Sequence, residues 1–341
     1  MGVEVVIAKR HPLILVTGAT GAVGPLVVRA FHAAGYSIRT LSIDPPPADI
    51  WPDDVETLLG DVTDLSAVRA AMQGAEAVIH LAALLHIVNP SPALQGQYER
   101  INVGGSSNVV AAAIEAGVRR LVFFSTISVY GQSGGQILTE DAPPYPDTVY
   151  ARTKLAAEKI VLEARAVDGG QLGVVLRLGA VYGFRIKGNY RRLVQSLASG
   201  RFIPVGNGSN RRTLVYDKDV ARASVLAATH PGAVGRIFNV TDGQFHTMKA
   251  IVETLCATLG RRSPRLVLPV APVRCLAGLL EDCSRLCRLR SPIVRATVDK
   301  YTEDLAVDGR RFHTRIGFVP QYNLAAGWQE TVAEMRKSGE I

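Results

Sequence analysis

The chain has 341 residues, which is enough for one large domain or two moderate ones with a substantial core. Hydrophobic residues make up 48% of it and charged residues 20%, a composition that excludes a globally disordered chain. The formal net charge of +8 would suit an anionic partner. Because the basic residues are scattered and form no long run interleaved with aromatic residues, we expect no nucleic acid partner.

The expected location of the protein follows from features that its sequence lacks. The N-terminal residues carry Glu4 and run directly into a strand-like segment, unlike a signal peptide. No stretch approaches the ~20 apolar residues of a membrane-spanning helix. We therefore expect a cytoplasmic protein without a membrane partner. The four cysteines have no histidine nearby at metal-ligand spacing, so we expect them to be reduced and expect no metal site.

The first half of the chain alternates strand-like and helical segments. Residues 13–17 (LILVT) form a short apolar run that ends at Gly18, as a buried parallel strand does. A helical pattern then runs from residue 24 and stops at Gly35, a favourable residue at the end of a helix. Further strands are expected within 37–44, 55–64, 76–83, 119–126 and 172–179, and helices at 65–74, 94–116 and after Tyr150. This alternation predicts an α/β fold with a doubly wound parallel sheet over residues 12–180.

Beyond residue 180 the regular alternation breaks up. Short segments with glycine, asparagine and proline alternate with helical ones, and residues 202–219 are expected to be mostly loop and strand. We expect residues 181–335 to form a smaller region that mainly binds substrate, with segments that return to the sheet.

The first junction between strand and helix is rich in glycine. It reads TGATGAVG, with Gly18, Gly21 and Gly24 in a G-x-x-G-x-x-G spacing. Glycines at such a turn allow the backbone to approach a pyrophosphate closely, and the N-terminal N–H groups of the following helix attract its charge. Because the turn follows a strand and opens a helix, it predicts dinucleotide binding.

Five motifs in order resemble the extended short-chain dehydrogenase/reductase family, the group of nucleotide-sugar epimerases, dehydratases and reductases. They are TGATGAVG, GDVTD at 60–64, HLAAL at 80–84, FFSTISVYG at 123–131 and YARTK at 150–154. The resemblance extends from about residue 12 to residue 330. It implies a Rossmann-type sheet with a smaller C-terminal substrate region, and a homodimer.

The resemblance also implies the catalytic residues. Tyr150 would be the general acid/base, Lys154 would lie one helical turn later, and Thr126 would bond the reacting oxygen and line the substrate site. A tyrosine with an ordinary pKa of about 10 is protonated at neutral pH. A nearby ammonium, together with the positive charge of an oxidised nicotinamide, favours the phenolate and would lower that pKa.

The same resemblance places the cofactor along the ends of the strands. Its implied contacts are Gly18, Thr20, Gly21, Ala22, Val23, Gly24, Asp44, Asp61, Val62, Leu81, Ala82, Ala83, Asn102, Ser125, Tyr150, Lys154 and Leu178. The usual acidic position of the second strand holds Ser42, with Asp44 two residues later and no arginine after it. A carboxylate bonds the ribose hydroxyl of NAD and repels the phosphate of NADP. We therefore expect NAD, while Ser42 leaves NADP open, and Asp44 has the competing interpretation of a turn residue before three prolines.

Three further residues are expected to contact a nucleotide-sugar substrate. Residues 206–223 (GNGSNRRTLVYDKDVARA) resemble the segment in which an arginine, here Arg212, holds the substrate diphosphate. KGNY at 187–190 resembles the loop that places Asn189 at the same diphosphate. His86 lies where it would line the pocket, although a structural loop histidine fits the pattern equally well. Ala180 stands where such enzymes often have asparagine, which keeps a hydroxysteroid-type alcohol dehydrogenase open as an alternative.

The motifs do not separate reduction of a 4-keto sugar from epimerisation at C4, because both need the same residues. Local resemblance in HLAALLHIVNP, KGNY and NRRTLVY favours reduction. A dehydratase is disfavoured because Thr126 is followed by Ile127 and Ser128 instead of the acidic pair of dehydratases. A non-catalytic NAD(P)-binding protein is the least favoured alternative, because Thr126, Tyr150 and Lys154 are all present.

Overall fold

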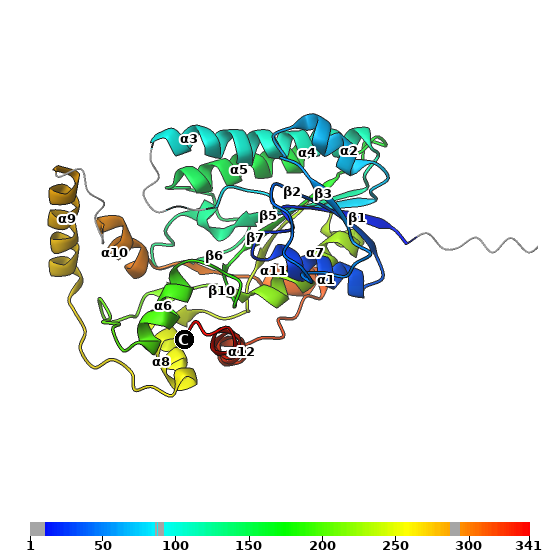
Figure 1. Ribbon diagram of the computed structural model, residues 1–341. Coiled ribbons are helices and arrows are strands. Elements are labelled where there is room, and N and C mark those ends of the chain that lie inside the picture. The colour runs from blue at the N-terminus through cyan, green and yellow to red at the C-terminus, as the bar shows by residue number, and fades with distance from the viewer. Residues whose placement is uncertain (1–10, 86, 88–91, 287–293) are drawn as a thin grey trace, which may run out of the picture.

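The protein is built on a seven-stranded sheet whose neighbouring strands all run parallel. The computed structural model describes residues 11–85, 87, 92–286 and 294–341 (Figure 1). Across the sheet the strands are β11 (Ile237–Val240), β7 (Gly173–Leu178), β5 (Arg120–Thr126), β4 (Ala77–His80), β1 (Leu13–Thr17), β2 (Ser37–Ser42) and β3 (Glu56–Leu59). The predicted Rossmann-type parallel sheet is confirmed.

Helices cover both faces of this sheet (Figure 1). One face carries α1 (Gly24–Ala33), α7 (Asp217–Thr229) and α11 (Arg310–Ile316), and the other carries α2 (Leu65–Met72), α4 (Gly105–Glu115) and α5 (Val149–Glu163). Side chains of a strand alternate between the two faces. Accordingly Ile14 and Val16 belong to the core under α1, whereas Leu15 between them belongs to the core under α2 and α4.

The helical segment predicted at 94–116 is interrupted by a π-helical stretch. It consists of α3 (Pro92–Tyr98), the π-helix η1 (Glu99–Gly104) and α4. Asn102 lies within this stretch and is 1% exposed. Stretches of π-helix inside a longer helix frequently occur at functional sites.

The residues after 180 build a third core and also contribute to the sheet. Helices α6 (Asn189–Ala198), α8 (Met248–Leu259) and α12 (Leu324–Lys337) surround buried Trp328 and Leu255. Strand β11 of this part of the chain pairs with β7 of the central sheet. The small strand pairs are β8 (Ala180–Tyr182) with β10 (Leu214–Tyr216), β9 (Arg211–Arg212) with β12 (His246–Thr247), and β6 (Ile137–Leu138) with β13 (Ala306–Val307).

Two helices, α9 (Val270–Leu286) and α10 (Arg295–Thr302), pack together at one end of the molecule (Figure 1). The short 3₁₀ helices are η2 (Ile127–Tyr130) and η3 (Pro231–Ala233). Among the described helices, none has the length and apolar character needed to cross a bilayer. In the same residues, no group of three His, Cys, Asp or Glu side chains is arranged to hold a metal ion.

Candidate active site

The three predicted catalytic residues meet where strand β5 ends and helix α5 begins. Thr126 is the last residue of β5, and Tyr150 and Lys154 lie in the first two turns of α5. The helix starts here because the Thr148 side chain caps it, accepting a hydrogen bond from the Ala151 backbone N–H at 3.1 Å. The carboxyl ends of parallel strands are the usual place for a ligand site in such sheets.

Tyr150 is held between Thr126 and Tyr98. Its phenol shares a hydrogen bond with the Thr126 hydroxyl, and its ring meets the Tyr98 ring edge-on with centroids 6.4 Å apart. The Tyr98 hydroxyl in turn donates to the Leu85 carbonyl at 2.7 Å. These contacts fix the phenol at the end of β5.

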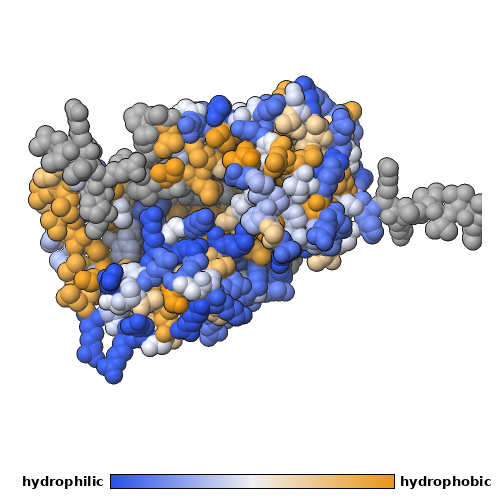
Figure 2. Space-filling model, in the orientation of Figure 1, coloured by the Kyte–Doolittle hydropathy of each residue, from blue (hydrophilic) through white to orange (hydrophobic). Residues whose placement is uncertain are grey.

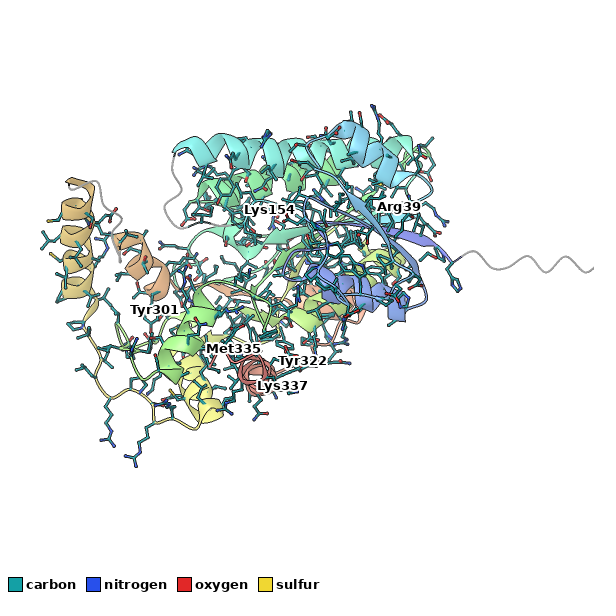
Figure 3. The ribbon with its side chains drawn as sticks, viewed as in Figure 1. Arg39, Lys154, Tyr301, Tyr322, Met335 and Lys337 are labelled. Carbon is teal, nitrogen blue, oxygen red and sulfur yellow. The ribbon has the colours of Figure 1, made fainter. Side chains whose placement is uncertain are left out.

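Lys154 lies between α5 and the sheet (Figure 3), and it is only 3% exposed. Its ammonium stands over the Phe123 ring, 4.0 Å from the centroid. Burial lowers the pKa of Lys154 to about 7, although the Glu158 carboxylate acts in the opposite direction. Lys154 can therefore change its charge near neutral pH.

The protein alone does not activate Tyr150. Burial raises the pKa of the Tyr150 phenol, the neighbouring Tyr98 acts in the same direction, and the hydrogen bond with Thr126 only partly opposes them. The pKa lowering that the sequence predicts is therefore not produced by the side chains around Tyr150.

A buried ion pair, not anticipated from the sequence, lies behind Lys154. The Arg177 guanidinium donates to the Glu158 carboxylate, with Nη2 2.6 Å from Oε2. The Ser125 hydroxyl donates to the same carboxylate. Ser125, predicted to contact the cofactor, is thus engaged with Glu158. The available signal was an arginine inside the otherwise apolar strand GVVLRL.

The glycine-rich turn fits a pyrophosphate. Gly18 has a φ of +71°, and an added Cβ would lie 2.7 Å from the Ala82 Cα. A Cβ on Gly24 would lie 2.1 Å from the Ala19 carbonyl oxygen, whereas one on Gly21 would meet only the Gly18 oxygen, at 3.1 Å. The turn is thus packed tightly against the segment after β4 at Gly18 and against itself at Gly24, but it is open at Gly21, beside the start of α1, which leaves a cradle for an anion.

The remaining predicted cofactor residues lie in this turn and at the carboxyl ends of the strands. Thr20, Ala22 and Val23 belong to the turn, Asp61 and Val62 follow β3, Leu81, Ala82 and Ala83 follow β4, and Leu178 ends β7. Asp44 is exposed, two residues beyond the end of β2.

Asn102 ties the loop after β4 to the catalytic helix. Its side-chain oxygen accepts from the Leu84 backbone N–H at 2.7 Å, and its amide donates to the Thr153 hydroxyl at 3.1 Å. The residue predicted as a cofactor contact therefore also fixes the backbone beside the site.

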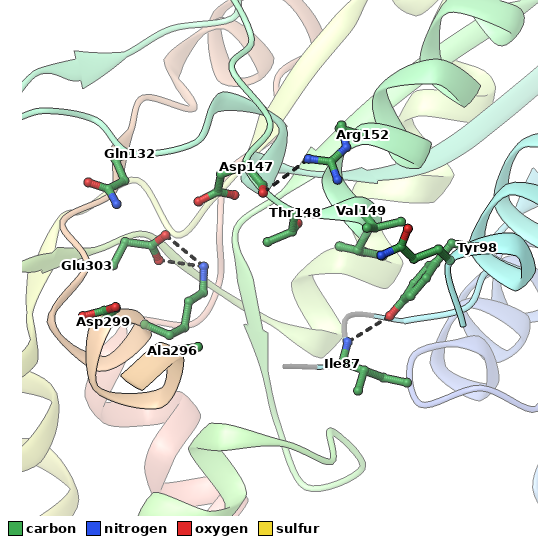
Figure 4. A pocket seen from close by; sticks show the side chains of 13 residues that line it. Ile87, Tyr98, Gln132, Asp147, Thr148, Val149, Arg152, Ala296, Asp299 and Glu303 are labelled. Carbon is green, nitrogen blue, oxygen red and sulfur yellow. Dashed lines mark hydrogen bonds and ion pairs between the residues drawn. The ribbon is translucent and has the colours of Figure 1, made fainter. Parts of the chain in front are cut away.

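A cavity of about 480 Å³ opens beside Tyr150 (Figure 4). Its lining includes Tyr98 and Thr148, and residues 296–303 supply the opposite wall. The charged residues of the lining are Asp147, Arg152, Asp299, Lys300 and Glu303. Such a lining suits a polar ligand.

Arg212 lies behind the Glu303 wall of this cavity. Its Nη1 is 2.9 Å from the Glu303 carboxylate, and Nη2 donates to the Tyr301 carbonyl at 3.2 Å and to the Lys300 carbonyl. Asn189 is an exposed residue at the start of α6 and is absent from the cavity lining, and His86 lies outside the described residues. The structure thus brings Arg212 near the cavity, but with its guanidinium already paired.

A Rossmann-type sheet, a glycine-lined cradle and a Tyr–Lys pair beside a polar cavity together define a nucleotide-dependent oxidoreductase fold. The model of the NAD dependent epimerase/dehydratase family matches residues 14–241, and the chain belongs to this family. The NAD in that description agrees with the cofactor expected from the sequence.

Three similar proteins illustrate the range of this family. The N-acetyl-alpha-D-glucosaminyl-diphospho-ditrans,octacis-undecaprenol 4-epimerase of Escherichia coli O157:H7 is 28% identical, over 94% of each chain. A 3 beta-hydroxysteroid dehydrogenase/Delta 5-->4-isomerase of Mycobacterium tuberculosis is 29% identical, over 76% of this chain and 73% of its own. The structure of MoeE5 in complex with UDP-glucose and NAD is 26% identical and has a TM-score of 0.75, covering 95% of this chain and 99% of that one.

Proposed function

We propose that the protein is an NAD-dependent enzyme that acts at C4 of a sugar linked to a nucleoside diphosphate, with Tyr150 as the acid/base. The observation that carries this proposal is the charged cavity beside the Tyr150 phenol, with Arg212 behind its wall. A hydroxyl-rich, diphosphate-bearing ligand suits such walls better than a steroid does. An apolar ligand would desolvate the charged groups of the walls without replacing their hydrogen bonds, which costs free energy.

The Tyr150 phenol is the group that moves the proton. When bound, NAD supplies a hydride acceptor and donor for the ring carbon. In its phenolate form Tyr150 takes the proton of the sugar hydroxyl as that carbon is oxidised, and it returns the proton on reduction, while Thr126 orients the same oxygen. A charged Lys154, one helical turn after Tyr150, would stabilise the phenolate.

Arg212 is the proposed diphosphate ligand. The planar guanidinium matches two phosphate oxygens, and the resemblance of residues 206–223 supports this role. Because Arg212 is paired with Glu303 at 2.9 Å, a substrate diphosphate would have to displace that carboxylate. Asn189 and His86 are further residues that we propose contact the nucleotide-sugar substrate.

The charges that follow β2 support NAD over NADP. Residues 43–55 contain four aspartates and no lysine or arginine. This segment offers a ribose 2′-phosphate acidic side chains and no basic one of its own, which is unfavourable by Coulomb repulsion.

Epimerisation is the reaction that the relatives support, because the Escherichia coli protein named as a 4-epimerase aligns over 94% of each chain. Reduction of a 4-keto sugar, favoured by the local motifs, would consume reduced nicotinamide with every turnover. The two are distinguished by mixing the enzyme with a 4-keto nucleotide sugar and NADH and following the absorbance of the reduced nicotinamide. A stoichiometric loss of absorbance would show that the reaction is reduction and not epimerisation.

A hydroxysteroid dehydrogenase is the second candidate, since one relative with that name is 29% identical. Ligand-induced stabilisation separates the two candidates. UDP at 100 times its Kd should stabilise a nucleotide-sugar enzyme by about 2.7 kcal/mol, whereas a steroid enzyme should respond to a steroid alone. The proposal fails if UDP leaves the melting temperature unchanged in the presence of NAD.

A further inference from the structure

Among the described residues, helix α9 packs mainly on α10. Gly278 faces α10, and a Cβ at this position would lie 2.3 Å from the Arg295 Nε. Two ion pairs secure the contact: Arg274 Nε lies 2.6 Å from Asp299, and Arg295 Nη2 lies 2.7 Å from Asp282. These contacts orient α9 and determine which side of it is left open.

The open side of α9 is apolar. Leu276, Leu279 and Leu280 are each at least 39% exposed, and their spacing of three and four residues places them on one helical face. Leu266 and Val267, in the segment before the helix, are 61% and 47% exposed. We call these five residues the α9 surface. Figure 2 shows hydrophobic side chains gathered along this helix.

The segment that leads into α9 is basic, whereas Glu281 and Asp282, which follow Leu280, are paired with Arg295 of α10. Between Thr254 and Leu280 the chain has four arginines and no acidic residue. Arg261, Arg262 and Arg265 are exposed and directly precede Leu266. The same stretch has no aromatic residue, whereas protein interfaces are enriched in aromatic side chains. Exposed leucines flanked by arginines match an anionic lipid surface better than a protein partner.

We propose that the α9 surface docks on a membrane containing anionic lipids, with α9 lying in the interface. Its 17 residues and its charged inner side suit a helix that lies on a bilayer without crossing it. This departs from the expectation that no membrane is a partner, which rested on the lack of a spanning segment. The inference does not rest on the proposed function, because none of the five residues lines the cavity.

Docking would also determine how the active site faces the bilayer. Residues Ala296, Asp299 and Lys300 of α10 line the cavity, and α9 packs directly on α10. A membrane that contacts the α9 surface would therefore lie on the side of the molecule where this wall of the cavity is built.

The test is flotation of the full chain with phosphatidylcholine vesicles that contain phosphatidylglycerol. Wild-type protein should float with these vesicles, and pure phosphatidylcholine or high salt should reduce the bound fraction. Replacing Arg261, Arg262 and Arg265 with glutamine should weaken partitioning by about fivefold for each arginine. Leu276→Glu with Leu279→Glu should weaken it by more than about tenfold.

Matched controls are Arg315→Gln on α11 and Val167→Glu, an exposed valine after α5; both should bind vesicles like the wild type. NAD affinity should stay unchanged in every variant, which excludes misfolding. Failure of the wild type to bind these vesicles would overturn the proposal. So would a lipid-free change from dimer to monomer in the leucine variant, because the surface would then be an interface between two copies of this chain.

Discussion

At the scale of single residues, the site combines groups whose ordinary ionisation is shifted by burial. The Tyr150 phenol has a raised pKa and the Lys154 amine a pKa lowered to about 7, so the phenol keeps its proton at neutral pH. Both shifts disfavour the charged form, as burial does. The proposed chemistry therefore depends on cofactor binding to make the phenol reactive.

Tyr150→Phe should reduce turnover by roughly 10²–10⁴-fold, the usual contribution of a positioned acid/base. The ring contact with Tyr98 is retained in phenylalanine, so NAD affinity and melting temperature should change little. Steady-state kinetics, NAD titration and calorimetry measure the three quantities. Wild-type turnover in this variant would show that Tyr150 is not the acid/base.

Arg212→Ala should weaken binding of a nucleotide sugar by about 1.5–3 kcal/mol, the range for hydrogen bonds to charged groups, without changing NAD affinity. The neighbouring Arg211 offers a matched control, since it forms a similar ion pair, with Asp304 at 2.6 Å. Arg211→Ala should leave nucleotide-sugar affinity unchanged.

Glu303→Gln should strengthen nucleotide-sugar binding, because it removes the carboxylate that competes for Arg212. Titration calorimetry compares the two proteins. Weaker binding in Glu303→Gln would mean that Glu303 itself holds the ligand.

At the scale of elements, His80 links β1, β4 and α4. Its Nδ1 lies 2.7 Å from the Thr17 hydroxyl oxygen, and its Nε2 lies 3.0 Å from the Ser106 hydroxyl oxygen. Burial lowers the pKa of His80 to about 3, and the Lys154 charge acts in the same direction. The histidine is therefore neutral in the folded protein at neutral pH.

This lowered pKa predicts a loss of stability in acid. The unfolded chain binds the His80 proton below about pH 6.5, whereas the folded protein does so only near pH 3. The free energy of unfolding should thus fall by up to about 1.4 kcal/mol per pH unit between these values. Urea unfolding of His80→Gln should show a lower stability at neutral pH and a flatter decline in acid. An equal decline in both proteins would refute the assignment.

Elements whose formation depends on neighbouring residues in the sequence could be predicted better than features that depend on contacts between distant residues. The strands around Leu15 and Val78 were predicted because buried parallel strands are continuous apolar runs, and the turn at Gly18 because its glycines follow such a strand. The π-helical stretch at Asn102 could not be predicted from the sequence. The Asn102 side chain there forms hydrogen bonds with Leu84 and with Thr153, which is 51 residues away.

Side-chain pairs between distant segments could not be predicted from the sequence either. Arg212 and Glu303 are 91 residues apart, and nothing near either residue indicates the other. The ion pair of Glu158 with Arg177 joins a helix to a strand and was equally hidden. The Tyr150–Lys154 pair could be predicted because its two residues lie four positions apart in one helix and belong to a family motif.

At the scale of the whole molecule, the proposed function joins two parts of the chain. The glycine cradle and the Tyr150 phenol come from the first 180 residues, whereas residues 296–303 build the opposite wall of the cavity and Arg212 lies behind it. The proposed chemistry requires both parts at once, because hydride transfer at C4 places cofactor and sugar against the same phenol.

The most direct test of this account is to incubate the purified protein with NAD and UDP-glucose, and separately with NAD and a 3β-hydroxysteroid, and to identify the products. We predict that UDP-glucose is converted to its C4 epimer without accumulation of reduced nicotinamide, and that the steroid remains unchanged. Oxidation of the steroid, with no conversion of UDP-glucose or of any other nucleoside-diphosphate hexose supplied, would contradict the account.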